Sequence, residues 1–200
     1  MTSPKVAAVI LAAGTASRFR AAAGDAIATK LVAKLDGKPL IRHVVEAVLK
    51  SRAAPIIIVT GHAENEVRAA LKGLGMIYVR NDDYASGIAS SVKCGIAQVP
   101  DEYDGAFVLL GDMPKVSGAL LNQLIEAFAA HPQARAVVPF YQGERGNPAL
   151  ISRALFPEVE KLSGDIGARA LLKSAGSNVV EVPVSSDAVS FDIDTPDLLR

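Results

Sequence analysis

Residues 6–30 read VAAVILAAGTASRFRAAAGDAIATK and predict the strand and loop around which the rest of the chain folds. Val6–Leu11 is a short, wholly apolar run with the length and composition of a buried parallel strand. The loop after it combines small residues with one hydroxyl and two cations: Ala12, Ala13, Gly14, Ser17, Arg18 and Lys30. Backbone N–H groups beside small residues can approach an anion closely, so the loop predicts a binding site for polyphosphate.

Two well-known nucleotide loops do not match this stretch. A dinucleotide loop needs G-x-G-x-x-G after the first strand and an acidic residue at the end of the second. This loop contains Gly14 alone, and the second apolar run, Ile56–Val59, is followed by T-G-H. The spacing G-x-x-x-x-G-K-[ST] is also absent from it. A dinucleotide-binding oxidoreductase is therefore disfavoured, and an ordinary strand-to-helix turn is the alternative to a phosphate site.

The composition favours one domain over residues 1–200. Half of the residues are hydrophobic and 21% are charged, which suits one compact α/β core. The formal net charge is zero and there is no basic tract, so nucleic acid is not an expected partner. The apolar runs are shorter than a membrane span, and the first residues lack a secretory segment. With Cys94 as the single cysteine, we expect a cytoplasmic protein without membrane contact.

Apolar periodicity alternates between strand and helix along the chain. The expected strands after the first are 55–60, 76–80, 105–110, 136–140, 149–151 and 179–184. The expected helices are 39–49, 64–74, 88–99, 117–130 and 168–172. This alternation predicts a mostly parallel sheet with right-handed crossovers. Sites in such sheets lie at the carboxyl ends of the strands, so the residues that follow each strand are the functional candidates.

An apolar strand delivers a carboxylate in residues 104–114, which read DGAFVLLGDMP. Asp112 follows the strand directly, Gly111 keeps the approach open, and Pro114 prevents the strand from continuing. Mg²⁺ prefers a few carboxylates together with phosphate oxygens and water. We therefore expect Asp112 to bind a metal ion; an acidic residue in a surface turn is the alternative.

Gly87 precedes an expected helix whose first turns carry Ser90 and Ser91. Free N–H groups and hydroxyls at a helix N-terminus can bind an anion or the edge of a base. A capped helix with small packing residues explains the same pattern.

Two later segments carry polar residues that suit a phosphorylated acceptor. Residues 141–148 read YQGERGNP, and Arg145 could hold a phosphate through two hydrogen bonds. A hairpin turn with one exposed arginine is the alternative. Residues 163–169 read SGDIGAR, in which Asp165 could simply cap the following helix.

Residues 190–198, SFDIDTPDL, place Asp192 and Asp194 on one side of a strand-like segment. Two neighbouring carboxylates repel each other unless a cation or a proton joins them. The pattern favours a second metal contact at this pair of carboxylates. Thr195-Pro196 also fits a helix start, which Asp194 would only flank.

Five motifs follow one another between residues 6 and 199: L-A-A-G…R…K, G-D-M-P, R-G-N-P, G-D-x-G-A-R and D-I-D-T-P. Together they resemble the MobA-like nucleotidyltransferases, especially the molybdenum cofactor cytidylyltransferases of the MocA type. One departure is that Arg18 and Lys30 lie 12 positions apart, because the insert Ala21–Ala28 separates them. Lys30 is matched to the family lysine through the turn and helix start that follow it, DGKPLI at residues 36–41.

The resemblance implies a three-layer α/β/α, Rossmann-like nucleotidyltransferase domain. It implies transfer of CMP from CTP to a phosphorylated acceptor, a molybdopterin-type molybdenum cofactor, with Mg²⁺ bound and pyrophosphate released. A molybdenum oxidoreductase would receive the product. The implied catalytic residues are Arg18, Lys30 and Asp112, and the implied metal ligands are Asp112 and Asp192. The nucleotide would contact Leu11, Ala12, Ala13, Gly14, Arg18, Lys30, Gly87 and Ser91. The acceptor would contact Arg145, Asn147, Asp165 and Arg169.

Two alternatives use most of the same residues. A same-fold enzyme could modify another acceptor or use GTP, and a non-catalytic protein could bind molybdenum cofactor and deliver it. Proteins resembling L-A-A-G at the first loop tend to use CTP, whereas those with L-A-G-G use GTP. The chain has L-A-A-G at Leu11–Gly14, and the methyl group of Ala13 would narrow the base site in favour of a pyrimidine.

Overall fold

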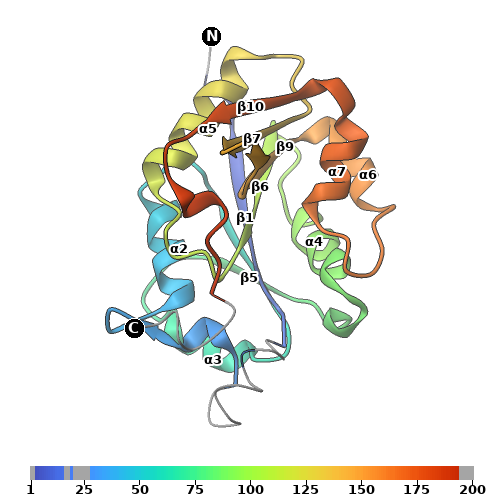
Figure 1. Ribbon diagram of the computed structural model, residues 1–200. Coiled ribbons are helices and arrows are strands. Elements are labelled where there is room, and N and C mark those ends of the chain that lie inside the picture. Colours follow the sequence, from blue (N-terminus) through green and yellow to red (C-terminus); the bar gives the residue numbers. More distant parts are fainter. Residues whose placement is uncertain (1–2, 16–18, 20–27, 194–200) are drawn as a thin grey trace.

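A mostly parallel sheet runs through the centre of the protein, with helices on both of its faces (Figure 1). The computed structural model describes residues 3–15, 19 and 28–193. The sheet has eight strands, seven of them in the order β10-β7-β9-β6-β1-β4-β5, and β8 pairs with β7. The expected three-layer α/β/α architecture is confirmed.

The strands are β1 (Val6–Ala12), β4 (Ile56–Thr60), β5 (Ile77–Arg80), β6 (Gly105–Leu110), β7 (Ala136–Tyr141), β8 (Glu144–Arg145), β9 (Ala149–Ser152) and β10 (Val179–Pro183). A separate hairpin consists of β2 (Lys34–Leu35) and β3 (Lys38–Pro39). The α-helices of the described residues are α2 (Leu40–Leu49), α3 (Glu64–Ala70), α4 (Ile88–Ile96), α5 (Gly118–Ala130), α6 (Phe156–Val159) and α7 (Ala168–Ala175). No helix of this part of the chain is both long enough and apolar enough to cross a membrane.

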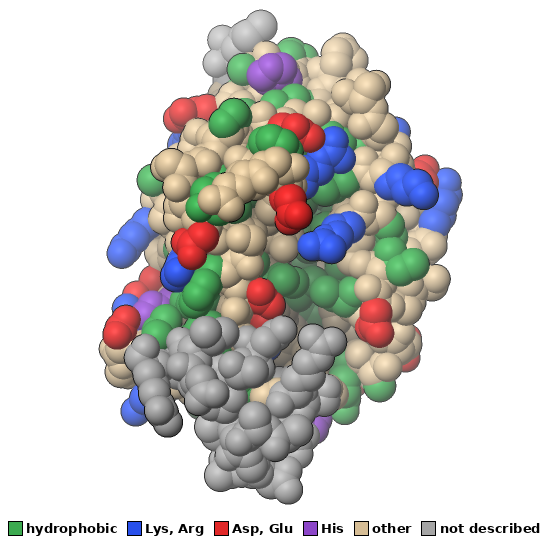
Figure 2. Space-filling model, in the orientation of Figure 1, with side chains coloured by type: hydrophobic (Ala, Val, Ile, Leu, Met, Phe, Trp, Pro, Cys, Tyr) green, Lys and Arg blue, Asp and Glu red, His purple; other side chains and the backbone are tan. Residues whose placement is uncertain are grey.

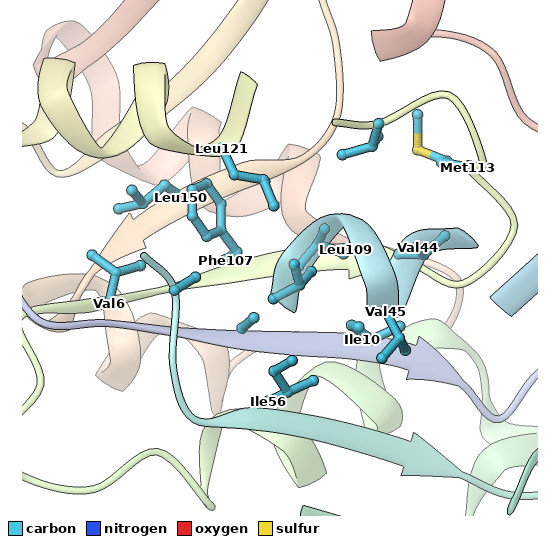
Figure 3. Packing of buried hydrophobic residues seen from close by; sticks show 14 of the residues in the cluster. Val6, Ile10, Val44, Val45, Ile56, Phe107, Leu109, Met113, Leu121 and Leu150 are labelled. Carbon is cyan, nitrogen blue, oxygen red and sulfur yellow. The ribbon is translucent and has the colours of Figure 1, made fainter. Parts of the chain in front are cut away.

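β1 lies in the middle of the sheet, and all seven of its residues are buried. Successive side chains of a strand point to opposite faces, so β1 supplies both layers of the core. Val6, Ala8 and Ile10 pack with α2, α3 and α5, as Figure 3 shows for several of these residues. Ala7 and Val9 pack with α4, α6 and α7 on the other face. An uninterrupted apolar run is therefore what this central position requires.

β9 runs against the direction of its two neighbours, β6 and β7. Because it is antiparallel, β9 begins at the edge of the sheet where β6 and β7 end, and Ala149 pairs with Val108 near the end of β6. The residues just before β9 therefore lie at the same edge as Asp112. This reversal places the segment around Arg145 and Asn147 among the strand ends.

A third, smaller core lies beside the sheet edge that carries the strand ends. It contains Phe19, Ala33, Leu40 and Ile193, all buried, and Phe191 packs against it. These residues come from three distant parts of the sequence. The cluster therefore fixes the segment that carries Asp192.

Most expected elements are present, with some differences at their ends. α3 ends at Ala70 and α4 at Ile96, whereas longer helices were expected, because the following residues form turns. The expectation of a strand-like segment from residue 190 is wrong for the described part, because Ser190–Ile193 form no strand. β2, β3 and β8 were not predicted because two-residue strands carry no detectable periodicity.

Candidate active site

The loop after β1 leads into the site, and its lysine is held by local structure. Gly14 and Thr15 are exposed directly after the buried strand. Lys30 begins a short 3-10 helix, Lys30–Val32, which Thr29 caps by accepting a hydrogen bond from the N–H of Leu31. Leu31 is buried and anchors this turn in the core. Lys30 is therefore presented from a fixed turn, although residues 21–27 of the preceding insert lie outside the described residues.

Asp112 follows β6 and forms an ion pair with Lys30. Its Oδ2 lies 2.5 Å from Nζ of Lys30, and both side chains are largely buried. The turn is fixed because the N–H of Gly111 donates to the carbonyl of Leu11 at 3.1 Å. The structure thus brings together a carboxylate and an ammonium group that are 82 positions apart in the sequence.

A pocket of about 560 Å³ opens beside this ion pair and the β1 loop. Of the residues expected to contact a nucleotide, its walls include Leu11, Ala13, Gly14, Lys30, Gly87 and Ser91, together with Asp112. Ala12 is not among the residues of its walls: it ends β1 opposite Thr60, and its methyl group packs in the core. Arg18 lies outside the described residues. We name this space the nucleotide pocket.

The α4 wall of the nucleotide pocket is built on glycines. An added Cβ at Gly95 would overlap the side chains of Val9 and Val59, so α4 lies close against the sheet. Gly87 has a φ of 115°, and a Cβ there would overlap the backbone of Gly164. The N–H of Ala89 donates to the carbonyl of Gly164 at 3.1 Å. One N–H of the α4 N-terminus is therefore already used within the protein.

A second pocket, of about 810 Å³, adjoins the first. Its walls include all four residues expected to contact the acceptor, Arg145, Asn147, Asp165 and Arg169, and also Asp192. Apolar side chains such as Val108, Met113 and Ile166 complete it. The space-filling view shows a hollow with apolar side chains at its floor and charges of both signs around it (Figure 2). We name this space the acceptor pocket.

Two of these polar residues are positioned by neighbouring strands and loops. Nε of Arg145, on β8, lies 2.7 Å from Oε1 of Glu181, on β10. The N–H of Asn147 donates to the carbonyl of Val189 at 2.7 Å. Arg145 is thus paired in this structure, and a phosphate would have to compete with Glu181 for it.

The segment of Asp192 passes directly beside Asp112. The N–H of Ile193 donates to the backbone carbonyl of Asp112 at 3.3 Å, and Ile193 is fully buried. The ammonium of Lys115 forms a cation–π contact with the ring of Phe191, with Nζ 3.6 Å from the ring centroid. Asp192 itself is exposed in the acceptor pocket. The two aspartates therefore stand in adjoining pockets, and Asp194 lies outside the described residues.

The donor set fits a divalent cation that is completed by its substrate. Among residues 3–15, 19 and 28–193, no three His, Cys, Asp or Glu side chains gather into a metal cage. Asp112 nevertheless already faces a cation, the ammonium of Lys30, within a wall of the nucleotide pocket. Magnesium commonly uses one or two carboxylates and takes its other ligands from phosphates and water.

One polar residue at the site was missed from the sequence. Asn81, just after β5, is buried, and its Nδ2 donates to the hydroxyls of Ser90 and Ser91. Its only sequence signal was a polar residue at a strand end. That signal fits the general expectation for α/β sheets.

The chain matches the family model for the MobA-like NTP transferase domain over residues 8–179. The protein GlmU of Kineococcus radiotolerans is 32% identical over 141 residues, which is 68% of this chain and 28% of GlmU. The chain spans about a quarter to a third of the GlmU proteins it matches. The purine catabolism protein PucB of Bacillus subtilis is 31% identical over 210 residues, covering 98% of this chain and 95% of PucB.

Solved structures agree with this relationship. Rv0371c of Mycobacterium tuberculosis has a TM-score of 0.81 and 28% identity, and the match covers 98% of this chain and 96% of that one. A complex of Rv0371c with manganese has a TM-score of 0.71 and 25% identity, with 92% and 90% coverage. A nucleotidyl transferase from Methanothermobacter has a TM-score of 0.79 and 26% identity, with 96% and 93% coverage. The chain therefore belongs to the family of MobA-like NTP transferase domains.

Proposed function

We propose that the chain is a single nucleotidyltransferase domain that transfers CMP from CTP to a phosphorylated acceptor, a molybdopterin-type molybdenum cofactor. The observation that carries this proposal is the Lys30–Asp112 pair, which stands in the wall of the nucleotide pocket next to a second, larger pocket. Two adjoining pockets with charged groups near their boundary are what a reaction between two bound substrates requires. Membership of the family supports the type of reaction.

In the proposed reaction, a terminal phosphate oxygen of the acceptor attacks the α-phosphorus of CTP. A new P–O bond forms, the bond between the α-phosphorus and its bridging oxygen breaks, and pyrophosphate leaves with the electron pair. The protein supplies no nucleophile and mainly aligns and neutralises the reactants. Lys30 and Arg18 would face the triphosphate, and Arg145, Asn147, Asp165 and Arg169 would hold the acceptor.

We propose Asp112 and Asp192 as the residues that hold a divalent cation, Mg²⁺. The ammonium that Asp112 already binds supports a cation at this carboxylate, and a related structure contains manganese. When bound, the ion would neutralise phosphate charge. Lys30 would then leave Asp112 for the triphosphate.

The choice of CTP rests on the residues at the end of β1. Ala13 lines the nucleotide pocket and is buried against Gly61. A Cβ added at Gly61 would lie only 2.8 Å from the Cβ of Ala13. Its methyl group therefore cannot move away from a larger base. One methyl group in a packed site discriminates by about 1 to 3 kcal/mol, so we expect a CTP preference of roughly tens to hundreds of fold.

The test is pyrophosphate release by the purified protein with molybdopterin-type acceptor, Mg²⁺ and each of CTP and GTP. A higher kcat/KM for CTP than for GTP with the same acceptor is expected. A preference for GTP, or none, would remove the cytidylyl assignment and leave the broader family. Other phosphorylated acceptors offered with CTP identify a different acceptor if one of them is used more efficiently.

A second candidate is a non-catalytic protein that binds molybdenum cofactor and delivers it to an oxidoreductase. The feature that favours it is the insert Ala21–Ala28, which departs from the family spacing between Arg18 and Lys30. Such a protein would bind the cofactor in the acceptor pocket and release no pyrophosphate from any nucleoside triphosphate. The same assay therefore separates the two candidates.

A further inference from the structure

The β1 loop separates two polar clusters at the edge of the sheet. The strand order β6-β1-β4-β5 places Asp112, after β6, on one side of the loop and Asn81, after β5, on the other. Lys30 and Asp112 mark the first side as the one that suits phosphates. The other side of the nucleotide pocket is left for the base.

Asn81 is almost fully buried, and each polar atom of its side chain is used. Its Oδ1 accepts the N–H of Asp83 at 3.0 Å, which fixes the orientation of the amide because only the oxygen can accept. Its Nδ2 therefore faces the two serines, and it donates to Oγ of Ser90 at 2.8 Å and of Ser91 at 3.0 Å. The backbone N–H of Asn81 donates to the carbonyl of Thr60 at 2.8 Å, which ties the residue to β4.

The two serines differ in the use of their own protons. The hydroxyl of Ser90 donates its proton within the protein. Its acceptors are the backbone carbonyls of Asp83, at 2.9 Å, and of Gly87, at 2.8 Å. Oγ of Ser91 accepts from Asn81, and among the described residues no acceptor receives its proton. Ser91 is only 5% exposed and lines the nucleotide pocket, whereas Ser90 does not line it. A bound ligand is therefore the available acceptor for the Ser91 proton.

We propose that Asn81 is a positioning residue for base recognition, which holds the Ser91 hydroxyl as a hydrogen-bond donor to an acceptor atom on the edge of the base. This inference rests on the proposed nucleotide site. Cytosine presents a carbonyl oxygen and an unprotonated ring nitrogen side by side, and guanine also carries acceptors on its edge. A base acceptor buried without its donor loses roughly tenfold in affinity or more.

The experiment measures dissociation constants for CTP and for inorganic tripolyphosphate by calorimetry, at one fixed Mg²⁺ concentration. Tripolyphosphate has no base, so it reports the phosphate side alone. Ser91→Ala is expected to weaken CTP binding about tenfold or more and to change tripolyphosphate binding less than twofold. The matched control is Ser90→Ala, which removes a hydroxyl bonded to the same amide and is expected to leave both constants within about twofold.

The role of Asn81 needs its own variants. Asn81→Asp keeps the shape and the bond from Asp83 but turns the donor into an acceptor, which would draw the Ser91 proton away from the pocket. We expect it to weaken CTP binding as much as Ser91→Ala does. If Asn81→Asp does not fold, Asn81→Ala replaces it: its effect on CTP binding is expected to disappear when Ser91 is already alanine, because the two residues act through one hydroxyl.

Three results would overturn the proposal: equal losses for Ser90→Ala and Ser91→Ala, equal losses of CTP and tripolyphosphate, or additive effects of Asn81→Ala and Ser91→Ala. The wild-type protein tests the proposed function separately. If it binds GTP more tightly than CTP, the cytidylyl assignment fails, and the same variants then test the role of Asn81 with GTP.

Discussion

Asp112 is the side chain whose replacement should best separate catalysis from folding. It stands at the end of β6, where its carboxylate meets Lys30 and not the apolar core. We expect Asp112→Ala to abolish transfer, because loss of a metal ligand in phosphoryl chemistry costs several kcal/mol, roughly a thousandfold in rate. Pyrophosphate release at saturating Mg²⁺ measures this, and circular dichroism should show an intact fold. Near wild-type turnover would rule out the proposed metal site.

The matched control for Asp112 lies at the opposite end of the same strand. Asp104 directly precedes β6, and its Oδ2 accepts the N–H of Lys5 at 2.8 Å, far from both pockets. Asp104→Ala removes a carboxylate next to the opposite end of β6 and should leave the rate of transfer unchanged. Asp192→Ala should behave like Asp112→Ala.

Lys30 should oppose metal binding while no nucleotide is bound. Its ammonium lies 2.5 Å from the Asp112 carboxylate and neutralises the charge that would attract a cation. We expect Lys30→Met to tighten binding of Mn²⁺ to the nucleotide-free protein by roughly tenfold, a typical coupling between two sites. It should weaken tripolyphosphate binding at the same time.

Calorimetry with Mn²⁺ alone tests the effect of Lys30, and Lys115→Met is its control. Lys115 pairs with Asp187 at 3.0 Å and with the ring of Phe191, so its loss does not unmask Asp112. Unchanged Mn²⁺ affinity in Lys30→Met would show that the lysine does not compete with the metal.

Among the helices, α3 is tied to the edge strand β5 by an ion-pair network. Glu64 lies 2.9 Å from Arg80 and 2.7 Å from Arg68. The hydrogen bond from Arg80, and then that from Arg68, holds the pKa of Glu64 below its ordinary value of 4.5. Because the pKa is lower in the folded state, the pairing stabilises the protein above about pH 4.5, and this contribution is lost as the pH falls through the folded-state pKa.

We therefore expect Glu64→Gln to lower the melting temperature at pH 7, by an amount equivalent to about 0.5 to 1 kcal/mol, since the two arginines are exposed to solvent. The difference from wild type should shrink as the pH falls through the lowered folded-state pKa of Glu64, because the carboxyl group then becomes protonated in both states. Thermal unfolding at several pH values measures it. Glu66→Gln is the control, because Glu66 lies in the same turn, is exposed, and forms no ion pair among the described residues.

Gly87 joins α4 to the loop before α7. Its φ of 115° excludes most side chains, and a Cβ would overlap the backbone of Gly164. We expect Gly87→Ala to destabilise the fold by about 1 to 3 kcal/mol and to raise KM for the acceptor. Gly143→Ala is the control. Gly143 has a φ of 88° but open space around it, so this variant strains the backbone without any steric overlap of the new Cβ. Similar unfolding midpoints and KM values in the two variants would contradict this reading.

Over the protein as a whole, the sequence predicted the layers well because they rest on periodicity. The runs that became β1 and β6 have the length and composition of buried strands, and Asp112 comes directly after β6 and Gly111. The contact between Lys30 and Asp112 was not predictable in its detail, because it depends on a turn after an insert and on a strand far along the chain.

The missed features depend on chain segments that meet only after folding. Asn81 meets the hydroxyls of Ser90 and Ser91 only once α4 has packed over β4 and β5. Arg145 was predicted as a phosphate ligand, but its partner Glu181 belongs to a strand 36 residues later. The reversed β9, which brings Asn147 to the edge with Asp112, has the same apolar pattern as a parallel strand would have.

The hydrogen bond from Ala89 to Gly164 would have a kinetic consequence under the proposed function. It joins the first turn of α4 to the loop of Asp165, a residue that lines both pockets, so the two walls should tighten together. Each substrate would then help the other to bind, and by the same factor, because such coupling is reciprocal. A water molecule is too small to hold this loop in place as a bound acceptor substrate would. If the proposed function is correct, the bond between α4 and this loop should therefore also slow hydrolysis of bound CTP until the acceptor binds.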